Sequence, residues 1–295
     1  MAEPLPDAAP AVPRARGPWI EAWSVFRRNR AALIGLTLLG IVALVVIAGP
    51  LVYTVDPFEI VGSPKSAPGV EPDAPLGTDY LGRDVLAGMI KGGRPTLLVG
   101  FCAALITALI GITIGALGGY YGRAVDGVLG RVTEFFQVLP ALLFAMVLIT
   151  LFAPSLITVT LAIGVVAWTS MARLTRGEFL RIKELEYVRA ARSIGASNAR
   201  IIWRIILPNA MPPIIVSATL ATGSAILFEA GLSFLGLSDP NIMSWGLMIG
   251  SNRNYLREAW WAVTFPGVAI FITVLAISLV GDGLNDAFNP KLRTR

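Results

Sequence analysis

Long runs of apolar residues, almost free of charged side chains, alternate with polar segments along this chain. About 20 apolar residues, at about 1.5 Å of rise per residue, carry a helix across the hydrocarbon core of a bilayer. A helix also satisfies its own backbone hydrogen bonds there. We therefore expect an all-α integral membrane protein with six transmembrane helices. They cover residues 31–55, 95–122, two spans within 135–172 that are separated near 153–155, about 211–232 and about 262–280.

Polar segments between these runs suggest a division of the chain into five parts. The longest of the segments carries six carboxylates and several prolines, and the N-terminal segment is rich in Pro and Ala. In the latter, Trp19–Phe26 is expected to form a short helix at the membrane interface. The five parts are a tail at 1–30, a first transmembrane helix at 31–55, a loop at 56–93, a five-helix core at 94–285 that includes a polar segment at 184–209, and a tail at 286–295.

The distribution of Lys and Arg predicts the orientation, because basic residues concentrate on the cytoplasmic side of membrane proteins. If the N-terminus is cytoplasmic, 18 of the 24 Lys and Arg residues fall inside and six fall outside. We therefore expect both termini in the cytoplasm and the acidic loop 56–93 outside. The same asymmetry accounts for the pI near 9.7, so we expect the lipid bilayer and no nucleic acid as a partner.

Residue types that support metal and acid–base chemistry are scarce. The chain has no His, and its single cysteine, Cys102, lies within an apolar run and is expected to be a packing residue. A serine or cysteine hydrolase would therefore need a Lys base, and the lysines before the C-terminal tail all lie in polar segments. The phosphate-binding pattern G-x-x-x-x-G-K-[ST] is absent from the sequence. We expect a non-enzymatic chain that binds no cofactor or metal itself.

Glycines four residues apart indicate where helices pack closely. Gly111, Gly115 and Gly119 form two overlapping G-x-x-x-G patterns, and Gly118 with Gly122 forms a third. Small residues at this spacing let helix backbones approach one another in lipid.

The polar segment 184–209 carries the strongest indication of function. Residues 184–194 favour a helix, Gly195 suits the left-handed residue that ends a helix, and Ser197 can cap the next one. Pro208 and the two prolines that follow are expected to break the chain before the fifth span.

Apolar and polar residues are expected on different faces of the first of these short helices. The two groups are Val188, Ala191 and Ile194 on one face, and Arg189, Arg192 and Ser193 on the other. Such a small, alanine-rich surface offers a shallow knob to a groove in a partner. A basic amphipathic loop lying on anionic lipid is the alternative, and the residues alone leave both interpretations open.

This segment resembles the E-A-A-x3-G-x9-I-x-L-P loop of binding-protein-dependent ABC transporter permeases. The positions that match are Ala190, Ala191, Gly195, Ile205, Leu207 and Pro208. In that family the segment is the coupling helix, which docks into a cleft of the ATP-binding subunit. The resemblance implies that the coupling residues are Glu186, Arg189, Ala190, Ala191, Ile194, Gly195, Ala196, Ser197, Leu207 and Pro208.

One position departs from the family pattern, because Arg189 stands where the pattern has its Glu. A carboxylate role at that position is therefore not expected here. Glu186 lies one helical turn earlier and is a candidate to replace it.

The resemblance extends from about residue 27 to residue 293. It is to the "C" permease of dipeptide, oligopeptide and nickel importers, a type I importer fold, and the stretches at 76–85 (LGTDYLGRDV) and 281–290 (GDGLNDAFNP) are among those that match. It implies a multi-pass protein of a bacterial inner membrane that imports peptides. The implied partners are a second permease, two ATP-binding subunits that hold ATP and Mg, and an external substrate-binding protein.

Further candidates lie outside the coupling segment. Glu229 is the acidic residue placed well within a span and is a candidate for the translocation path, with a paired carboxylate near the outer end as the alternative. Asp79, Arg83 and Asp84 are expected to form an ion-paired turn in the outer loop, and contact with the binding protein is the alternative. The residues expected to mark the outer membrane interface are Trp245, Trp260 and Trp261.

Three other classes of protein remain as alternatives. An ion-gradient-driven secondary transporter would be expected to show an internal repeat or coupling acids near the midplane, and neither is clear in the sequence. An intramembrane enzyme would need a catalytic constellation that we do not find. A membrane scaffold would leave the spacing of residues 190–208 without a purpose. Within the importer interpretation, nickel, glutathione or another small solute remains an alternative cargo.

Overall fold

The computed structural model describes residues 18–288, and within them the chain is helical, with no strand longer than an isolated bridge. Residues 1–17 of the expected tail at 1–30, residues 289–295 of the expected tail at 286–295, and the side chain of Trp19 lie outside the described residues. The elements are α1 Pro18–Phe26, α2 Arg30–Val52, α3 Val85–Tyr121, α4 Arg123–Val138, α5 Ala141–Phe152, α6 Leu156–Ile182, α7 Glu186–Ser193, α8 Asn198–Arg200, the π-helix η1 Ile201–Ile206, α9 Leu207–Phe234, α10 Trp245–Asn252, the 3₁₀-helix η2 Arg253–Tyr255 and α11 Trp261–Phe288.

Within residues 18–288, five helices are long and apolar enough to cross a membrane: α2, α3, α6, the continuous helix Asn198–Phe234, and α11. The expected third span is not one straight helix, because α4 and α5 meet at an angle of 88°. The cause is Pro140. Leu139, the residue before this proline, takes an extended conformation with φ −70° and ψ 129°, as residues before proline do. Six spans result if the bent pair crosses the membrane together.

Two of the spanning helices run beyond the apolar stretch that predicted them. α3 begins at Val85 rather than near Pro95, because the Asp84 carboxylate accepts a hydrogen bond from the Leu86 amide and caps the helix. Pro95 therefore lies inside this helix. α6 continues past Ala172 to Ile182, so its last turns carry basic residues out of the apolar region.

The expected break at Pro208 was wrong. The helix continues from Asn198 to Phe234 and widens to a π-helix at Ile201–Ile206, where the Leu207 amide donates to the Ile202 carbonyl. Pro208, the second residue of α9, directly follows this wider turn, and the helix does not break there.

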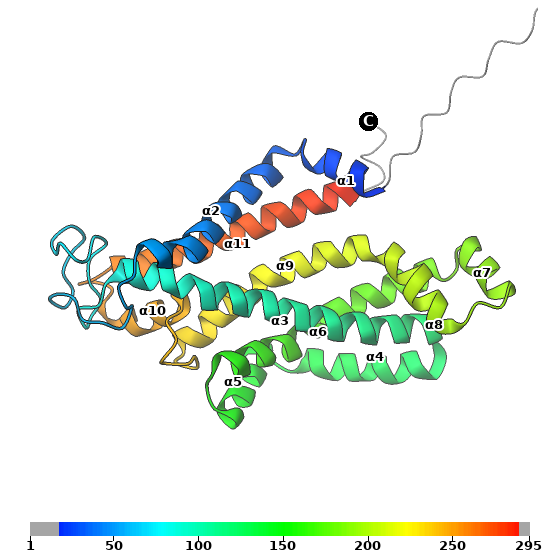
Figure 1. The fold of residues 1–295 in the computed structure, drawn as a ribbon. Coiled ribbons are helices and arrows are strands. Elements are labelled where there is room, and N and C mark those ends of the chain that lie inside the picture. The colour runs from blue at the N-terminus through cyan, green and yellow to red at the C-terminus, as the bar shows by residue number, and fades with distance from the viewer. Residues whose placement is uncertain (1–17, 289–295) are drawn as a thin grey trace, which may run out of the picture.

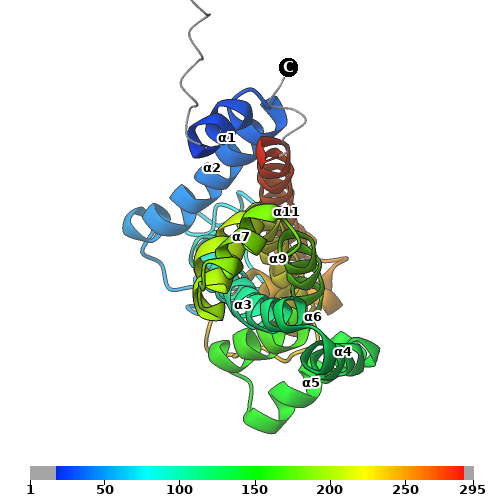
Figure 2. The ribbon, with the colours of Figure 1, turned by 90° about the vertical axis from the view of Figure 1, so that its right-hand side faces the viewer.

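Close packing of α3 against α6 forms the centre of the bundle, and α9 lies along both (Figure 1). Gly111, Gly115 and Gly119 of the predicted glycine patterns lie in this contact, whereas Gly118 faces α4 and Gly122 follows the end of α3. A Cβ built on Gly115 would be 2.4 Å from the Ala172 carbonyl oxygen, and the Gly111 and Gly119 positions are as tightly enclosed by α6. Seen from the right-hand end, α2 and α11 form a separate layer on the far side of α9 from α4 (Figure 2).

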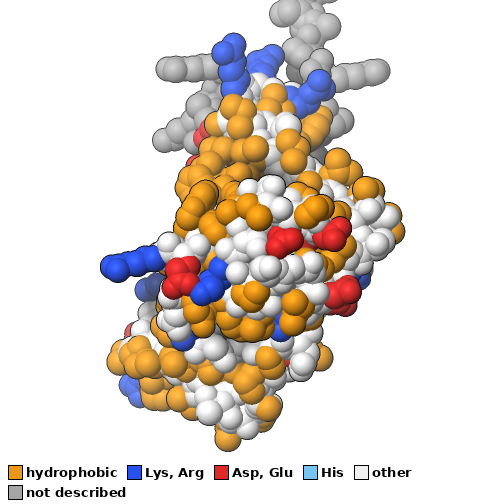
Figure 3. Space-filling view, turned by 90° about the vertical axis from the view of Figure 1, so that its left-hand side faces the viewer, with side chains coloured by type: hydrophobic (Ala, Val, Ile, Leu, Met, Phe, Trp, Pro, Cys, Tyr) orange, Lys and Arg blue, Asp and Glu red, His pale blue; other side chains and the backbone are white. Residues whose placement is uncertain are grey.

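At the left-hand end of Figure 1, residues 53–84 fold over α10 and the start of α11. Trp245 and Trp261 are buried, and their indole N–H groups donate to the Met89 and Thr78 carbonyls, respectively. They therefore hold these segments together and do not mark the membrane interface. Trp260 alone of the three is exposed. Carboxylates and basic groups lie among apolar side chains on this end of the molecule (Figure 3).

A tight turn forms at Asp79–Asp84, but without the expected side-chain ion pair. The Asp79 carboxylate accepts from the Leu81 and Arg83 amides, and the Arg83 guanidinium lies over the Phe58 ring, 5.1 Å from its centre. Burial raises the pKa of Asp79, while these amide hydrogen bonds oppose that shift.

Candidate functional site

The segment between α6 and α9 forms a small, well-defined turn of helix. α7 ends in a Schellman motif, in which the Gly195 amide donates to the Arg192 carbonyl and the Ala196 amide donates to the Ala191 carbonyl. Gly195 has φ +84°, which confirms the left-handed conformation expected of it. The Ser197 hydroxyl accepts from the Arg200 amide and begins the next helix, also as expected.

One buried side chain fixes α7 to the bundle. Val188 has no exposed surface and packs in the cluster that contains Ile201, Ile202 and Ile206. Because η1 runs directly into α9, any displacement of α7 acts on the start of that spanning helix.

Polar contacts with the end of α3 hold the same segment. The Tyr120 hydroxyl donates to the Asn198 side chain at 2.7 Å, and the Lys183 ammonium donates to the Gly119 carbonyl at 2.8 Å. The Arg192 guanidinium lies over the Tyr120 ring, 5.7 Å from its centre. α7 is therefore attached to α3, α6 and α9 together.

The exposed surface of this segment differs from the expected one. Ile194 is 86% exposed while Val188 is fully buried, so the two do not share a face as predicted. The reason is that the Schellman turn carries Ile194 away from the helix face that packs on η1. The remaining predicted residues divide into exposed Glu186, Arg189, Ala190, Gly195, Ser197 and Pro208, and half-buried Ala191, Ala196 and Leu207.

Arg189 forms an ion pair with Glu184 at 2.7 Å, with both side chains more than half exposed. This hydrogen bond from Arg189 lowers the pKa of Glu184, but an exposed pair of this kind adds little stability. Glu186 is exposed in the first turn of α7, so its carboxylate is accessible to a partner. A role for Glu186 in place of the family Glu stays a prediction.

Glu229 lies near the C-terminal end of α9 and is only 3% exposed. Its Oε1 accepts from the hydroxyls of Ser233 and Ser244, at 2.7 and 3.0 Å. Ser244 in turn caps α10 by accepting from the Leu247 amide. The carboxylate therefore ties α9 to the start of α10, and the cavity beside it, about 10 Å³, has room for one water at most.

For Glu229 this geometry gives a clear expected result. Gln keeps an acceptor for both serine hydroxyls, so Glu229→Gln should transport within about twofold of the wild type. Glu229→Ala leaves buried hydroxyls without their acceptor, and should lower the free energy of unfolding by about 2 kcal/mol. Thermal unfolding in detergent and an uptake assay measure the two effects. A folded Glu229→Gln chain that has lost uptake would instead place the carboxylate in the path.

A second feature, which the sequence interpretation missed, is a cavity of about 390 Å³ between α3, α5, α6 and α9. Its lining combines apolar side chains with hydroxyls from α6 and α9, including Thr169, Ser170, Ser217 and Ser224. The signal in the sequence was the recurrence of Ser217, Ala221 and Ser224 at helical spacing. These residues are small and polar and share one side of an otherwise apolar helix.

Apolar helices long enough to span a membrane surround a cavity that carries several hydroxyls, and a short, exposed helix lies at one end of the bundle. Residues 111–294 match a family described as "Binding-protein-dependent transport system inner membrane component". Residues 17–68 match the "N-terminal TM domain of oligopeptide transport permease C". The chain therefore belongs to this family, the membrane-embedded permease subunits of ABC importers.

Individual relatives agree with this assignment over nearly their whole lengths. A di/tripeptide transport system permease of Pseudomonas aeruginosa is 38% identical over 282 residues, covering 94% of this chain and 93% of its own. A dipeptide permease of Haemophilus influenzae is 39% identical, covering 94% and 96%, and the oligopeptide permease OppC of Bacillus subtilis is 35% identical, covering 93% and 90%.

Solved structures of an inward-facing MetNI methionine ABC transporter are similar in fold. One matches with a TM-score of 0.57 and 18% identity, covering 68% of this chain and 96% of that one. At this identity the match supports the helical arrangement alone.

Proposed function

We propose that this chain and a second permease form the membrane path of an ATP-driven importer of dipeptides and oligopeptides. The names of its relatives support the class of cargo, since they are dipeptide, di/tripeptide and oligopeptide permeases. The observation that carries the coupling role is the exposed side chain of Ile194, called the knob below. It lies at the end of α7, a helix whose Val188 is fully buried. Hydrolysis of ATP is assigned to partner subunits, and an external binding protein delivers the cargo.

The orientation that we propose has α7 in the cytoplasm of a bacterial cell, together with both termini, and residues 53–84 outside. The described ends of the chain support a common side, because α1 packs against the end of α11 through Phe26 and Ala287. In Figure 1 these ends lie toward the same side of the molecule as α7. The excess of basic residues on that side agrees with the positive-inside rule.

For the path itself, we assign the hydroxyl-lined cavity that contains Ser217 and Ser224. Hydroxyls both donate and accept hydrogen bonds, so they can satisfy a peptide backbone without selecting a particular side chain. Selection of cargo then belongs to the external binding protein. Glu229 supports the outer end of the path helix α9 by holding α10 in place, rather than by meeting the peptide.

Coupling follows from the way α7 is attached. An ATP-binding subunit that closes on ATP pushes on the turn at Gly195. Val188, which packs in the same buried cluster as Ile202, passes the displacement to η1 and α9. α6, which ends just before α7, moves with it. ATP drives the change because the closed ATP-binding subunits bind one conformation of the permease more tightly than the other.

Cross-linking from the knob tests the assembly and the orientation together. In a Cys102→Ser background, a cysteine at Ile194 should cross-link to an ATP-binding subunit, and mass spectrometry of the purified complex should also find a second permease. A cysteine at the exposed Val70, in the opposite end of the molecule, is the matched control and should not cross-link to that subunit. A chain that purifies alone from several mild detergents, without ATPase activity, would refute the proposal and favour a secondary transporter or a scaffold.

The cargo is tested separately with the reconstituted complex. Labelled dipeptides and tripeptides should accumulate in proteoliposomes only with ATP, the binding protein and the ATP-binding subunits. Nickel and glutathione are the competing cargoes. Accumulation of either, without accumulation of peptides, would keep the importer and change its substrate.

A further inference from the structure

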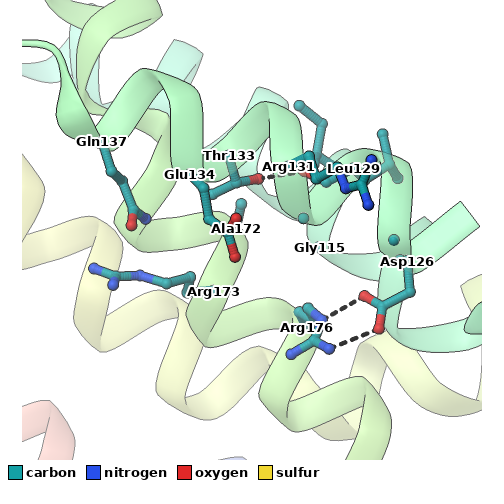
Figure 4. Close-up of a pocket in the computed structure, with 14 residues that line it drawn as sticks. Gly115, Asp126, Leu129, Arg131, Thr133, Glu134, Gln137, Ala172, Arg173 and Arg176 are labelled. Atoms are coloured by element: carbon teal, nitrogen blue, oxygen red, sulfur yellow. Dashed lines mark hydrogen bonds and ion pairs between the residues drawn. The ribbon is translucent and has the colours of Figure 1, made fainter.

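A polar cavity of about 430 Å³ lies between α3, α4 and α6, at the end of the bundle that carries α7 (Figure 4). It is separate from the hydroxyl-lined cavity, which lies among α3, α5, α6 and α9. The α3 side of the cavity is formed by Ile114, Gly115 and Gly118. None of the residues assigned above to coupling or to the path lines it.

Charges in this cavity do not cancel among the residues that the structure describes. Arg176 donates to both oxygens of Asp126, at 2.5 and 2.6 Å, so these two groups neutralise each other. Arg131, Arg173 and Glu134 remain, and no ion pair joins them among the described residues. Two guanidinium groups therefore face the cavity against one carboxylate.

An unpaired donor strengthens this bias toward an anion. The side-chain nitrogen of Gln137 is buried and has no hydrogen-bond partner among the described residues. In Figure 4 the Gln137 side chain points from α4 toward the Arg173 side chain on α6. A buried donor without an acceptor is destabilising, and an oxyanion placed between these two side chains would supply the missing acceptor. Guanidinium groups bind such oxyanions with strong, charge-assisted hydrogen bonds.

The position of the cavity indicates where the oxyanion comes from. α4 is amphipathic: its polar residues face the cavity, while Val128 and Phe135 on the other side are more than half exposed. Such a helix in a membrane protein has its apolar side against lipid tails. Basic pockets between membrane helices, at the ends of the helices, bind anionic lipid headgroups.

We infer that this cavity binds the phosphate of an anionic phospholipid, with Arg173 as the cationic contact and the Gln137 amide as a donor. The lipid would bridge α4 and α6. Because α6 leads directly to α7, a headgroup bound here would brace the helix from which the coupling segment extends. This site concerns the membrane around the permease and is independent of the cargo.

Native mass spectrometry of the purified chain, titrated with phosphatidylglycerol or phosphatidylcholine, tests the inference. We expect the wild type to retain phosphatidylglycerol preferentially, and Arg173→Gln to weaken that retention about fivefold, the effect of one basic residue at a lipid surface. Gln137→Leu, which leaves the charge unchanged, should also weaken it. The matched control is Arg200→Gln, an exposed arginine at the same end that does not line the cavity, and it should retain the lipid as the wild type does.

Each other outcome overturns the assignment. Equal retention of the two lipids, or retention unaffected by both variants, would show that the cavity does not bind lipid phosphate. Displacement of phosphatidylglycerol by millimolar inorganic phosphate would make it a site for a soluble oxyanion instead. Occupation by a side chain of the second permease would appear as lipid binding that is lost on forming the complex. If Arg173→Gln fails to insert, Gln137→Leu alone decides the question.

Discussion

Replacing Gly195 with Pro is expected to abolish uptake while leaving an inserted, folded permease. Gly195 has φ +84°, whereas the proline ring fixes φ near −65°. The substitution also removes the amide that donates to the Arg192 carbonyl at 3.0 Å. The Schellman turn then fails and Ile194 leaves its position. Because a Cβ at Gly195 would meet nothing within 4 Å, the damage stays local.

Gly195→Ala is a milder change, because it strains the left-handed residue but keeps the amide that donates to Arg192. A non-glycine residue in the left-handed region costs about 1–2 kcal/mol, so this variant should keep partial uptake. Uptake of labelled peptide, with co-purification of the ATP-binding subunits, measures both variants. The result expected for Gly195→Pro is loss of those subunits as well as of transport.

A matched control exists at the opposite end of the molecule. Gly236 has φ +83° and ends α9 with the same pair of hydrogen bonds, from its own amide to Ser233 and from Leu237 to Leu232. It too has open space around it. Gly236→Pro therefore produces the same local disruption away from the coupling segment, and it should still co-purify with the ATP-binding subunits. Full uptake by Gly195→Pro, or equal loss of the subunits from both variants, would refute the coupling role.

Much of the fold followed from hydrophobicity because a bilayer imposes one simple requirement. Each spanning segment must be apolar, long and internally hydrogen-bonded, and these properties can be counted along a sequence. The ends of the helices were harder to predict from the sequence. Asp84 extends α3 beyond its apolar stretch by capping it, and α6 continues through charged turns to Ile182. Once a helix leaves the membrane, hydropathy no longer reports where it stops.

Prolines account for the largest errors, in opposite directions. Pro140 produced a bend of 88° that was not expected, whereas Pro208 failed to produce the break that was. The difference lies in the neighbouring backbone. Before Pro208 the helix widens to the π-helix Ile201–Ile206 and then continues as α9. At Pro140 one helix ends and another begins. Sequence shows that a proline is present, but tertiary contacts decide between a bend and a continuous helix.

In the candidate site, too, some features could be predicted from the sequence and others could not. Gly195 and Ser197 could be assigned from sequence because left-handed turns and helix caps are local properties. The burial of Val188, the pairing of Glu229 with Ser244 and both cavities depend on segments distant in sequence. No local pattern specifies such contacts. The sequence shows that Arg189 replaces the family Glu, but only the structure shows that Arg189 pairs with Glu184.

Gly115→Leu is expected to destabilise the helix bundle strongly. Its Cβ would lie 2.4 Å from the Ala172 carbonyl oxygen and 2.7 Å from the Thr175 Cβ, and both belong to the backbone or to a buried residue of α6. Neither can move without separating α3 from α6. Overpacking of this kind costs about 3 kcal/mol or more, and here it opens the central helix pair, so the yield of monodisperse protein in mild detergent should fall sharply.

Gly40→Leu is the matched control, since Gly40 is a glycine of the apolar helix α2 with nothing within 4 Å of its Cβ position. Leucine there adds the same side chain without a collision, and it should leave the yield and the thermal unfolding unchanged. Gly115→Leu protein that elutes and unfolds like Gly40→Leu would show that α3 and α6 are not in contact through this glycine. The close approach predicted from the spacing of Gly111, Gly115 and Gly119 would then be wrong, and the support of the coupling segment by α3 and α6 with it.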